Sequence, residues 1–386
     1  MKIVCSSNMP YAMEAFRQFG EVVSKPGRAI TAADARDADA LMIRSTTRVS
    51  RALLEGSRVR FVGTATIGVD HMDVAWMDSA GIRWCSAPGC NANSVSEYVT
   101  AALLCIGGRR GIALEGRTLG VIGVGNVGSR VVKKAEALGM RVLMNDPPRQ
   151  AAEGGCAFTG LEALLRESDA VTLHVPMEKQ GLHPTWHMAG NDFFKAMKPG
   201  AIFLNAARGA VVDSPALLRA MDAGRLSAVV LDTWEHEPEF PLELLLRVDL
   251  GTPHIAGHSF EGKVMGTLMV YREFCRHLGV APTWTPDALL PAPAVPELAL
   301  DAAGRPDEDV LREAVRAVYD IERDDRDLRA GCPADGKARA EHFEGLRLKY
   351  WMRREFQYTR LNVAGGTERL AEKLARLGFA AGGSPS

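Results

Sequence analysis

Three polar loops in the second half of the chain contain the residue types that proton and hydride transfer require. Arg208 lies in the segment NAARG, Glu237 in DTWEHEP and His254 in TPHIAG. A neutral histidine can remove the proton of a hydroxyl group near pH 7, and a nearby carboxylate would stabilise the imidazolium. An arginine can bind a substrate carboxylate with two hydrogen bonds and polarise the reacting oxygen. These three residues are therefore candidate catalytic residues for the oxidation of a 2-hydroxy acid.

The same loops also have structural interpretations. A single histidine after a strand is often part of the core, Glu237 could be a solvated surface acid, and Asp232 could cap a turn. His174, two residues before Pro176, could contact a cofactor or be structural. The presence of an arginine, a Glu-Pro and a Pro-His pair downstream of a nucleotide-binding pattern favours the catalytic interpretation.

That nucleotide-binding pattern lies in residues 118–147. Gly123, Gly125 and Gly128 have the G-x-G-x-x-G spacing, between an apolar run at 119–122 and a helical pattern at 127–138. The first glycine permits a tight turn, the second lets the backbone approach a pyrophosphate, and the third lets helix and strand pack closely. The N-terminus of the helix offers unpaired N–H groups to the phosphates. Placed between strand and helix, the motif predicts dinucleotide binding.

An acidic residue at the end of the next strand specifies the cofactor. Asp146 follows Gly128 by eighteen residues, close to the spacing expected for a carboxylate that binds the adenosine ribose. Its charge would repel a 2′-phosphate, so NAD is favoured over NADP, although Arg149 is close enough to leave the second possible. Asn126 and Val127, inside the glycine motif, are also expected cofactor contacts.

The order of apolar and helical segments predicts an α/β fold built on a doubly wound parallel Rossmann domain. Its expected strands are residues 119–122, 141–145, 170–175, 201–205, 228–232 and 249–250. We expect three domains: a smaller, discontinuous flavodoxin-like substrate lobe, the NAD-binding domain, and a C-terminal α+β domain. Their predicted boundaries are residues 1–93 with 257–280, 94–256, and 281–386.

The first 90 residues alternate short strands and helices, with polar loops after the strands. Because ligands bind at the carboxyl ends of parallel strands, Arg44, Ser45 and Thr66 are candidate substrate contacts. They could equally be turn and cap residues.

Helix signals are clear at several places. Ser94 and Glu97 fit a capping box at the start of a helix over residues 95–106. Residues 261–278 also form one helical pattern. In the C-terminal segment, helical periodicity runs over 310–321, and another helix is expected around 343–356.

Bulk composition narrows the classes of protein. The 386 residues are 47% hydrophobic and 24% charged, with a net charge of −1, so no basic surplus favours nucleic acid. The N-terminus lacks a signal-peptide pattern, and no apolar run reaches membrane-spanning length. Seven scattered cysteines without a C-x-x-C pair indicate a reduced, cytoplasmic protein without a structural metal site.

The segments GVGNVG, NAARGAVVD, LDTWEHEP and TPHIAG together resemble the D-isomer-specific 2-hydroxyacid dehydrogenase family. The resemblance extends over about residues 61–261. It implies an NAD-dependent enzyme in which Arg208, Glu237 and His254 are catalytic.

A closer resemblance, to a branch of that family that oxidises a phosphorylated sugar acid in pyridoxal 5′-phosphate synthesis, covers nearly the whole chain. It rests on NMPYA, GTATIGVDH, APGCNANSVSEYV, GTPHIAGHSFEGK and VYDIERDDRDLR. It implies a homodimer formed through the C-terminal domain. The implied cofactor contacts are Asp146, Val175, Ala206, Ala207, Arg208, Asp232 and Gly257, and the implied substrate contacts are Ser45, Thr66 and His258.

Two positions depart from the branch pattern. His258 stands where a tyrosine is expected, and Val175 stands where a threonine is common. Arg44 and Arg347 are further candidates for binding a substrate phosphate.

Two other functions remain open: a related dehydrogenase acting on 3-phosphoglycerate or glyoxylate/hydroxypyruvate, and an NAD-sensing binding protein.

Overall fold

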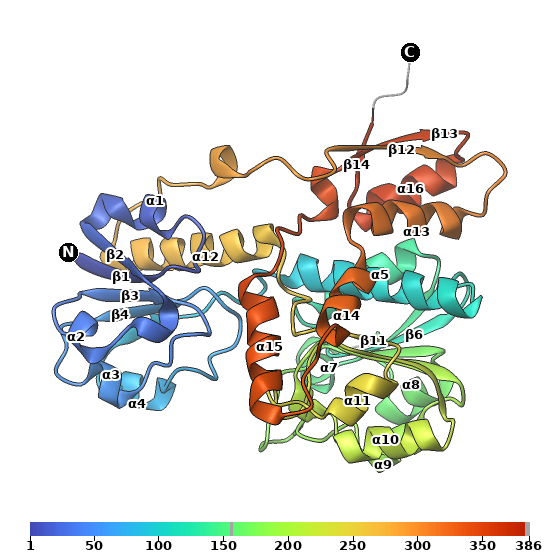
Figure 1. Ribbon diagram of the computed structural model, residues 1–386, viewed down its shortest axis with the longest axis horizontal. Helices are drawn as coiled ribbons and strands as arrows, with labels where there is room; N and C mark the ends of the chain where they lie inside the picture. Colours follow the sequence, from blue (N-terminus) through green and yellow to red (C-terminus); the bar gives the residue numbers. More distant parts are fainter. Residues whose placement is uncertain (155–156, 383–386) are drawn as a thin grey trace. The chain divides into compact units, whose positions relative to one another are not determined.

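The computed structural model describes residues 1–154 and 157–382 of the chain. It divides into two compact units, Met1–Ala92 with Ser259–Ala292 and Asn93–His258 with Pro293–Ser386. Figure 1 labels their helices and strands. The predicted α/β fold with parallel sheets is confirmed. The predicted independence of residues 281–386 as a dimerisation domain stays a prediction.

The first unit is a five-stranded parallel sheet with the strand order β2-β1-β3-β4-β5, which is the flavodoxin-like order. Ile3 and Cys5 pack in one apolar cluster and Val4 in another, because neighbouring side chains on a strand point to opposite faces. Its strands are β1 (Lys2–Ser6), β2 (Glu21–Lys25), β3 (Ala40–Ile43), β4 (Phe61–Thr64) and β5 (Arg83–Cys85). Its helices are α1 (Ala12–Phe16), α2 (Ala32–Ala35), α3 (Arg51–Leu54), α4 (Val74–Ser79) and α12 (Phe260–Leu278).

The second unit contains a six-stranded parallel sheet with the order β11-β10-β9-β8-β6-β7. The order reverses between β6 and β8, and in such sheets ligands bind at the carboxyl ends of the strands at this switch point. Its strands are β6 (Thr118–Ile122), β7 (Arg141–Asn145), β8 (Ala170–Leu173), β9 (Ala201–Asn205), β10 (Leu226–Leu231) and β11 (Leu250–Gly251).

Helices cover both faces of this sheet (Figure 1). One apolar cluster joins the sheet to α5 and α6, and a second joins it to α8, α9, α10 and α11. The helices are α5 (Ala92–Arg110), α6 (Gly128–Ala137), α7 (Pro147–Glu153), α8 (Leu161–Glu167), α9 (Asn191–Ala196), α10 (Ser214–Asp222) and α11 (Leu242–Arg247).

The C-terminal module, which we define as residues 293–382, belongs to the second unit and shares its core. Leu300, Leu361 and Leu374 join the same apolar cluster as α5 and α6, and α16 packs against α6. Its parallel strands are β12 (Glu297–Asp301), β13 (Arg360–Ala364) and β14 (Ala380–Ala381). Its helices are α13 (Asp307–Val318), α14 (Ile321–Arg329), α15 (Gly336–Leu348) and α16 (Glu368–Leu377).

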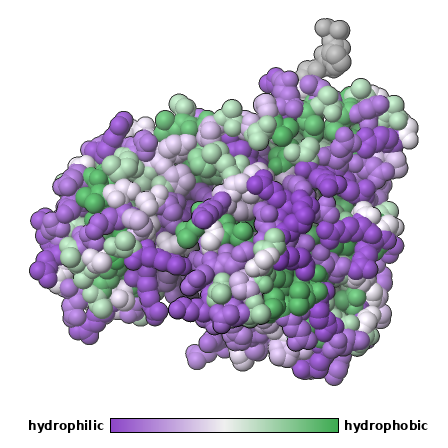
Figure 2. Space-filling view, in the orientation of Figure 1, coloured by the Kyte–Doolittle hydropathy of each residue, from purple (hydrophilic) through white to green (hydrophobic). Residues whose placement is uncertain are grey.

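Short 3₁₀ segments complete the chain: η1 (Arg17–Phe19), η2 (Gly27–Ala29), η3 (Gly209–Val211), η4 (Asp287–Leu289) and η5 (Phe356–Tyr358). Hydrophilic side chains cover most of the face drawn in Figure 2, with hydrophobic side chains in smaller areas between them. No helix within residues 1–154 and 157–382 is both long and apolar enough to cross a membrane.

Two helix predictions are wrong. The predicted capping box is absent because α5 begins at Ala92, so Ser94 lies inside the helix and its hydroxyl donates to the Ala256 carbonyl. The helix expected around 343–356 ends at Leu348, and the residues that follow are irregular up to η5. The helical pattern over 310–321 is interrupted at Tyr319 and Asp320, between α13 and α14.

Glu97 does not cap α5. It is a buried residue within α5 that faces the C-terminal module. Its Oε1 accepts hydrogen bonds from Asn93 Nδ2 and from the Phe356 backbone N–H, both at 3.0 Å. Asn93 also donates to Glu355 Oε2 at 2.7 Å. Burial, together with the nearby Glu355 carboxylate, raises the pKa of Glu97 to about 8.

This raised pKa predicts the pH dependence of stability. Between the ordinary carboxyl pKa and about 8, the folded state binds more protons at Glu97 than the unfolded state, so this group lowers stability as pH rises. Glu97→Gln removes the titration and keeps an acceptor oxygen. We expect the melting temperature of the variant, relative to the wild type, to increase from pH 6 to pH 8.5, as measured by differential scanning fluorimetry.

The matched control is Glu136→Gln on α6, whose carboxylate is about half exposed. It should show a difference in melting temperature that does not change with pH. A pH-independent difference for Glu97→Gln as well would contradict the prediction.

Candidate active site

The glycine motif forms a tight turn after β6. Gly123 has φ +84°, and a Cβ there would lie 2.7 Å from the backbone carbonyl of His174. A Cβ at Gly128 would lie 2.0 Å from the Gly123 oxygen, whereas one at Gly125 would meet nothing within 4 Å. The first and third glycines are thus required by packing, and Gly125, with Asn126 beside it, leaves an exposed backbone at the start of α6.

Asp146 lies at the carboxyl end of β7 and supports this turn. Its Oδ2 accepts the Val124 N–H at 2.8 Å, and its Oδ1 caps α7 by accepting the Arg149 N–H. The Arg149 guanidinium donates to the Val124 carbonyl and pairs with Glu153. This arginine is therefore already bound to groups of its own chain, which weakens the case for a 2′-phosphate site.

The two residues after β8, His174 and Val175, border the same turn. Val175 Cγ1 lies 2.8 Å from where a Gly123 Cβ would be, so the valine side chain borders the switch point. His174 hydrogen bonds to Thr172 through Nε2 at 3.0 Å, and burial lowers the pKa of His174 to about 3. A neutral, internally bonded imidazole fits the structural interpretation of His174.

The loop after β9 is fixed by an asparagine that ends the strand. Asn205 Oδ1 accepts the Ala207 N–H, and its Nδ2 donates to the Arg208 carbonyl, each at 3.0 Å. Ala206 and Arg208 are partly exposed, while Ala207 is buried. The Arg208 guanidinium donates to the Ala207 carbonyl at 2.8 Å.

Glu237 and His254 meet across two neighbouring loops. His254 Nδ1 lies 2.5 Å from Glu237 Oε1, and Glu237 Oε2 accepts the Trp234 N–H at 3.2 Å. Burial alone would raise the pKa of Glu237, but the His254 imidazole, Arg347 and the Trp234 N–H hold it below its ordinary value. The carboxylate is thus ionised near neutral pH and orients the His254 ring through Nδ1. The other ring nitrogen, Nε2, is left to form the second hydrogen bond of the imidazole.

Asp232 organises the loop that carries His254. Its Oδ1 accepts from the Thr252 hydroxyl at 2.7 Å and the Ile255 N–H at 2.8 Å, and its Oδ2 accepts from the Ala256 N–H at 3.0 Å. Burial raises the pKa of Asp232 despite these bonds. The turn-stabilising interpretation of Asp232 therefore describes its geometry, and its contact with a cofactor stays a prediction.

Residues beyond His254 approach the C-terminal module. Gly257 is partly exposed, and the His258 ring lies edge-on to Tyr350, with 5.7 Å between the ring centroids. An open cavity of about 310 Å³ is lined by Pro253 and by module residues that include Tyr350. The module therefore contributes side chains within this unit to the surroundings of the His254 loop.

Ser45 and Thr66 belong to the first unit. Ser45 is exposed in the turn after β3, and Thr66 follows β4 with its hydroxyl 2.8 Å from Thr64 Oγ1. Thr66 also donates to the Gly68 carbonyl at 3.2 Å. Their predicted contacts with substrate remain predictions.

Within the second unit, the loops after β6, β7, β8, β9, β10 and β11 thus carry the predicted residues at the carboxyl edge of one sheet. The open space at Gly125, the acid after β7 and the switch point between β6 and β8 fit a dinucleotide at this edge of the sheet. The fold and site define an NAD-dependent dehydrogenase.

Comparisons with known proteins give the class and the family. Residues 106–256 match the NAD-binding domain of the D-isomer specific 2-hydroxyacid dehydrogenases, and residues 289–378 match a domain of unknown function (DUF3410). Erythronate-4-phosphate dehydrogenase of Edwardsiella ictaluri is 47% identical over 98% of this chain and 99% of its own. That of Klebsiella pneumoniae is 46% identical over 98% of both chains. The chain belongs to the erythronate-4-phosphate dehydrogenase family.

A solved structure gives the same result for the fold. The NAD⁺-bound 3-phosphoglycerate dehydrogenase of Entamoeba histolytica is 25% identical, with a TM-score of 0.62 over 72% of this chain and 95% of its own.

Sequence reasoning named one module residue near the site, Arg347, whose charge helps to lower the pKa of Glu237, and missed Tyr350 and Arg353. Tyr350 and Arg353 lie in a segment predicted to be helical, and the actual irregular backbone directs Arg353 into the core, where it is 0% exposed. No local pattern indicated this burial. Arg353 is followed by Arg354, and two adjacent arginines ordinarily predict a solvated surface.

Close packing between the two loops that carry Arg208 and Glu237, two of the predicted catalytic residues, predicts the effect of one substitution. A Cβ at Gly209 would lie 1.8 Å from the Trp234 carbonyl oxygen, so Gly209→Ala must push the Arg208 and Glu237 loops apart. We expect overpacking to destabilise the fold by about 1–3 kcal/mol. We also expect kcat to fall at least about tenfold, because the catalytic groups move.

The control is Gly224→Ala, at a turn where an added Cβ meets nothing within 4 Å. Since Gly224 has φ +62°, some loss of stability is expected there too, with kcat unchanged. Chemical unfolding and steady-state kinetics measure both effects, and wild-type kcat in Gly209→Ala would refute the prediction.

Proposed function

We propose that the chain oxidises 4-phospho-D-erythronate to (R)-3-hydroxy-2-oxo-4-phosphooxybutanoate, a step of pyridoxal 5′-phosphate synthesis. The observation that carries the proposal is the His254–Glu237 pair, 2.5 Å apart, in a chain whose relatives along 98% of its length are named for this activity. NAD, when bound, accepts the hydride that leaves C2 of the substrate.

Three residues supply the remaining chemistry. His254 Nε2 takes the proton of the 2-hydroxyl as the carbonyl forms, because Glu237 holds Nδ1 and stabilises the resulting imidazolium. Arg208 binds the substrate carboxylate and polarises the reacting oxygen. General acid–base catalysis is typically worth about 10²–10⁴-fold, so orientation of the substrate must supply much of the remainder.

Binding roles extend the proposal. Gly123, Gly125, Asn126, Val127 and Gly128 hold the NAD phosphates, and Asp146 binds the adenosine ribose. Further cofactor contacts are Val175, Ala206, Ala207, Arg208, Asp232 and Gly257. Ser45, Thr66 and His258 contact the substrate.

The domain roles, oligomeric state and location are part of the same proposal. Residues 94–256 bind NAD, residues 1–93 with 257–280 bind substrate, and residues 281–386 form a homodimer. The homodimer rests on the family resemblance. A cytoplasmic location is supported by the pathway and by the free thiols of the six cysteines in the described part of the chain.

The direct test measures NADH formation by absorbance with 4-phospho-D-erythronate and with 3-phosphoglycerate, at matched concentrations. We expect a clear preference for phosphoerythronate in kcat/KM, with NADP used poorly because of Asp146. His254→Ala serves as the blank and should bind NAD without turnover. Preference for 3-phosphoglycerate would move the enzyme to a different reaction, and NAD binding without turnover on either substrate would favour an NAD sensor.

A further inference from the structure

The strand that leads to His254, β11, has only two residues. β11 pairs with β10 at two positions, Val230 with Leu250 and Leu231 with Gly251, and it is the edge of its sheet. His254, three residues later, has φ +52°, a conformation that costs a non-glycine residue about 1–3 kcal/mol. Such a backbone persists when surrounding groups hold it in place.

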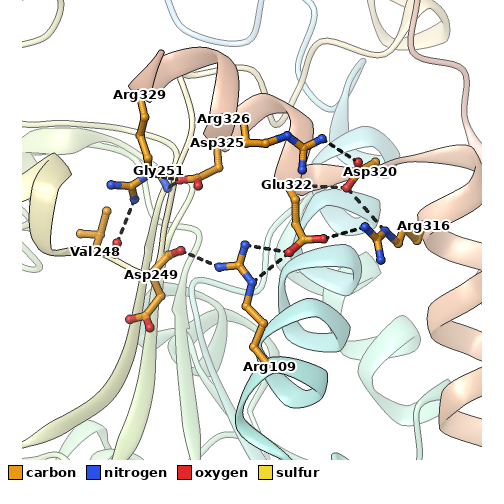
Figure 3. Close-up of polar contacts among 10 residues, drawn as sticks. All are labelled: Arg109, Val248, Asp249, Gly251, Arg316, Asp320, Glu322, Asp325, Arg326 and Arg329. Carbon is orange, nitrogen blue, oxygen red and sulfur yellow. Dashed lines mark hydrogen bonds and ion pairs between the residues drawn. The ribbon is translucent and has the colours of Figure 1, made fainter. Parts of the chain in front are cut away.

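On the outer side of β11, α14 of the C-terminal module supplies those groups (Figure 3). Asp325 Oδ1 accepts the Gly251 N–H at 2.7 Å in a buried position, and the same oxygen accepts from Arg329 Nε at 2.9 Å. Arg329 also donates to the carbonyls of Leu245 and Val248, at 2.6 and 2.9 Å. The Asp325 carboxylate thus satisfies an N–H of the edge strand, and Arg329 binds the carbonyls at the end of α11 and in the loop before β11.

A second group of charged residues joins α14 to α5 at the same edge (Figure 3). Arg109 donates to the Asp249 carbonyl at 2.9 Å and to Glu322 at 2.8 Å. Arg316 lies 3.2 Å from the other oxygen of Glu322. These partly exposed pairs contribute little stability individually, but they add contacts between α14, α5 and the residue before β11.

The module also holds the loop beyond His254. The Ala256 carbonyl accepts from Ser94 Oγ at 2.7 Å and from Arg353 Nη2 at 3.3 Å. Arg353 Nη2 donates to Ser94 Oγ at 2.7 Å, and its guanidinium lies 4.1 Å from the Tyr319 ring centroid. Because Arg353 is fully buried, this contact is a fixed part of the core.

We propose that the C-terminal module positions the catalytic histidine of the same chain by binding the backbone on both sides of it. Asp325 binds Gly251, which precedes His254, and Arg353 binds Ala256, which follows it. Asp325 and Arg353 are positioning residues, since they act on the loop and not on the substrate. The proposal gives the domain of unknown function a role in catalysis besides the proposed dimerisation, and it rests on the proposed role of His254.

The required precision explains why two-sided support is needed. A displacement of about 1 Å at a reacting group can cost on the order of 10²-fold in rate. The 2.5 Å contact of His254 with Glu237 spans two loops, so a shift of either one breaks it. Asp232 binds the backbone of the loop at Ile255 and Ala256. The module binds Gly251, before the loop, through Asp325, and the Ala256 carbonyl through Arg353.

The test compares Asp325→Ala with Asp327→Ala in the full-length chain. Asp325→Ala leaves the buried Gly251 N–H without its acceptor, whereas the Asp327 carboxylate, on the same helix, is about half exposed and 3.8 Å from Arg323. We expect Asp325→Ala to lower kcat at least about tenfold, with KM and the Kd for NAD within twofold. Asp325→Asn, which keeps an acceptor oxygen, should recover most of the rate, and Asp327→Ala should behave as wild type.

The deuterium isotope effect on kcat, with substrate deuterated at C2, separates positioning from loss of fold. A smaller folded fraction lowers kcat but leaves the isotope effect unchanged, whereas a displaced His254 slows the chemical step and increases it. An Asp325→Ala enzyme with wild-type kcat, or one whose loss matches its loss of folded protein, would overturn the proposal.

Ser94→Ala tests the contacts on the Ala256 side of His254, whether or not Asp325→Ala folds. The change removes the hydroxyl donor to Ala256 and one of the acceptors of Arg353, which keeps the Ser94 backbone carbonyl as a partner, and alanine favours the helix. We expect kcat to fall about three- to tenfold, with an increased isotope effect and intact NAD binding. Wild-type kinetics here would overturn the Arg353 arm. If the wild type itself fails to oxidise phosphoerythronate, the proposed function fails first and the positioning role falls with it.

Discussion

A buried carboxylate, Asp232, determines the shape of the loop on which the proposed chemistry depends. Its two oxygens accept hydrogen bonds from Thr252, Ile255 and Ala256, and the His254 N–H donates to the Asp232 carbonyl at 2.8 Å. These bonds surround a histidine in the left-handed region of φ and offset its strain. Without them, Nδ1 of His254 would have no fixed direction toward Glu237.

The neighbouring loops, which carry Arg208 and Glu237, are held by contacts with one another and with this loop. Asn205 closes the Arg208 turn, and Gly209 allows that turn to lie against the Trp234 carbonyl at a distance that a Cβ would prevent. Trp234 in turn donates from its indole to the Thr252 carbonyl at 2.8 Å. Arginine, glutamate and histidine are therefore fixed by backbone contacts between neighbouring strands, which is how an α/β sheet positions polar groups from distant parts of the chain.

Much of this arrangement could be predicted from the sequence, because the signals are local. The glycine motif, the apolar strands that precede each loop and the helix at residues 261–278 have periodicities and turn residues that few alternatives share. In the structure that helix is Phe260–Leu278. The half-exposed edge strand Glu21–Lys25 could not be predicted individually, since its short sequence EVVSK has too weak an apolar pattern.

Other features depend on contacts that local patterns do not contain. Ser94 and Glu97 have the spacing of a capping box, yet tertiary contacts with Ala256 and Phe356 use both side chains in the helix interior. Arg353 and Asp325 are charged residues in a charged segment, and their burial follows from packing between the module and the Rossmann sheet. Sequence alone could not distinguish them from the solvated charges beside them.

We propose that an ionised Glu237 holds His254 ready to accept the substrate proton. The most direct measurement is kcat/KM for phosphoerythronate in Glu237→Gln, with Glu239→Gln, an exposed residue of the same loop, as control. A loss on the order of 10²-fold or more in Glu237→Gln alone, with the Kd for NAD unchanged, is predicted, because the amide cannot stabilise the imidazolium by charge. A Glu237→Gln enzyme within about threefold of the wild type, less than general acid–base catalysis is usually worth, would contradict the account.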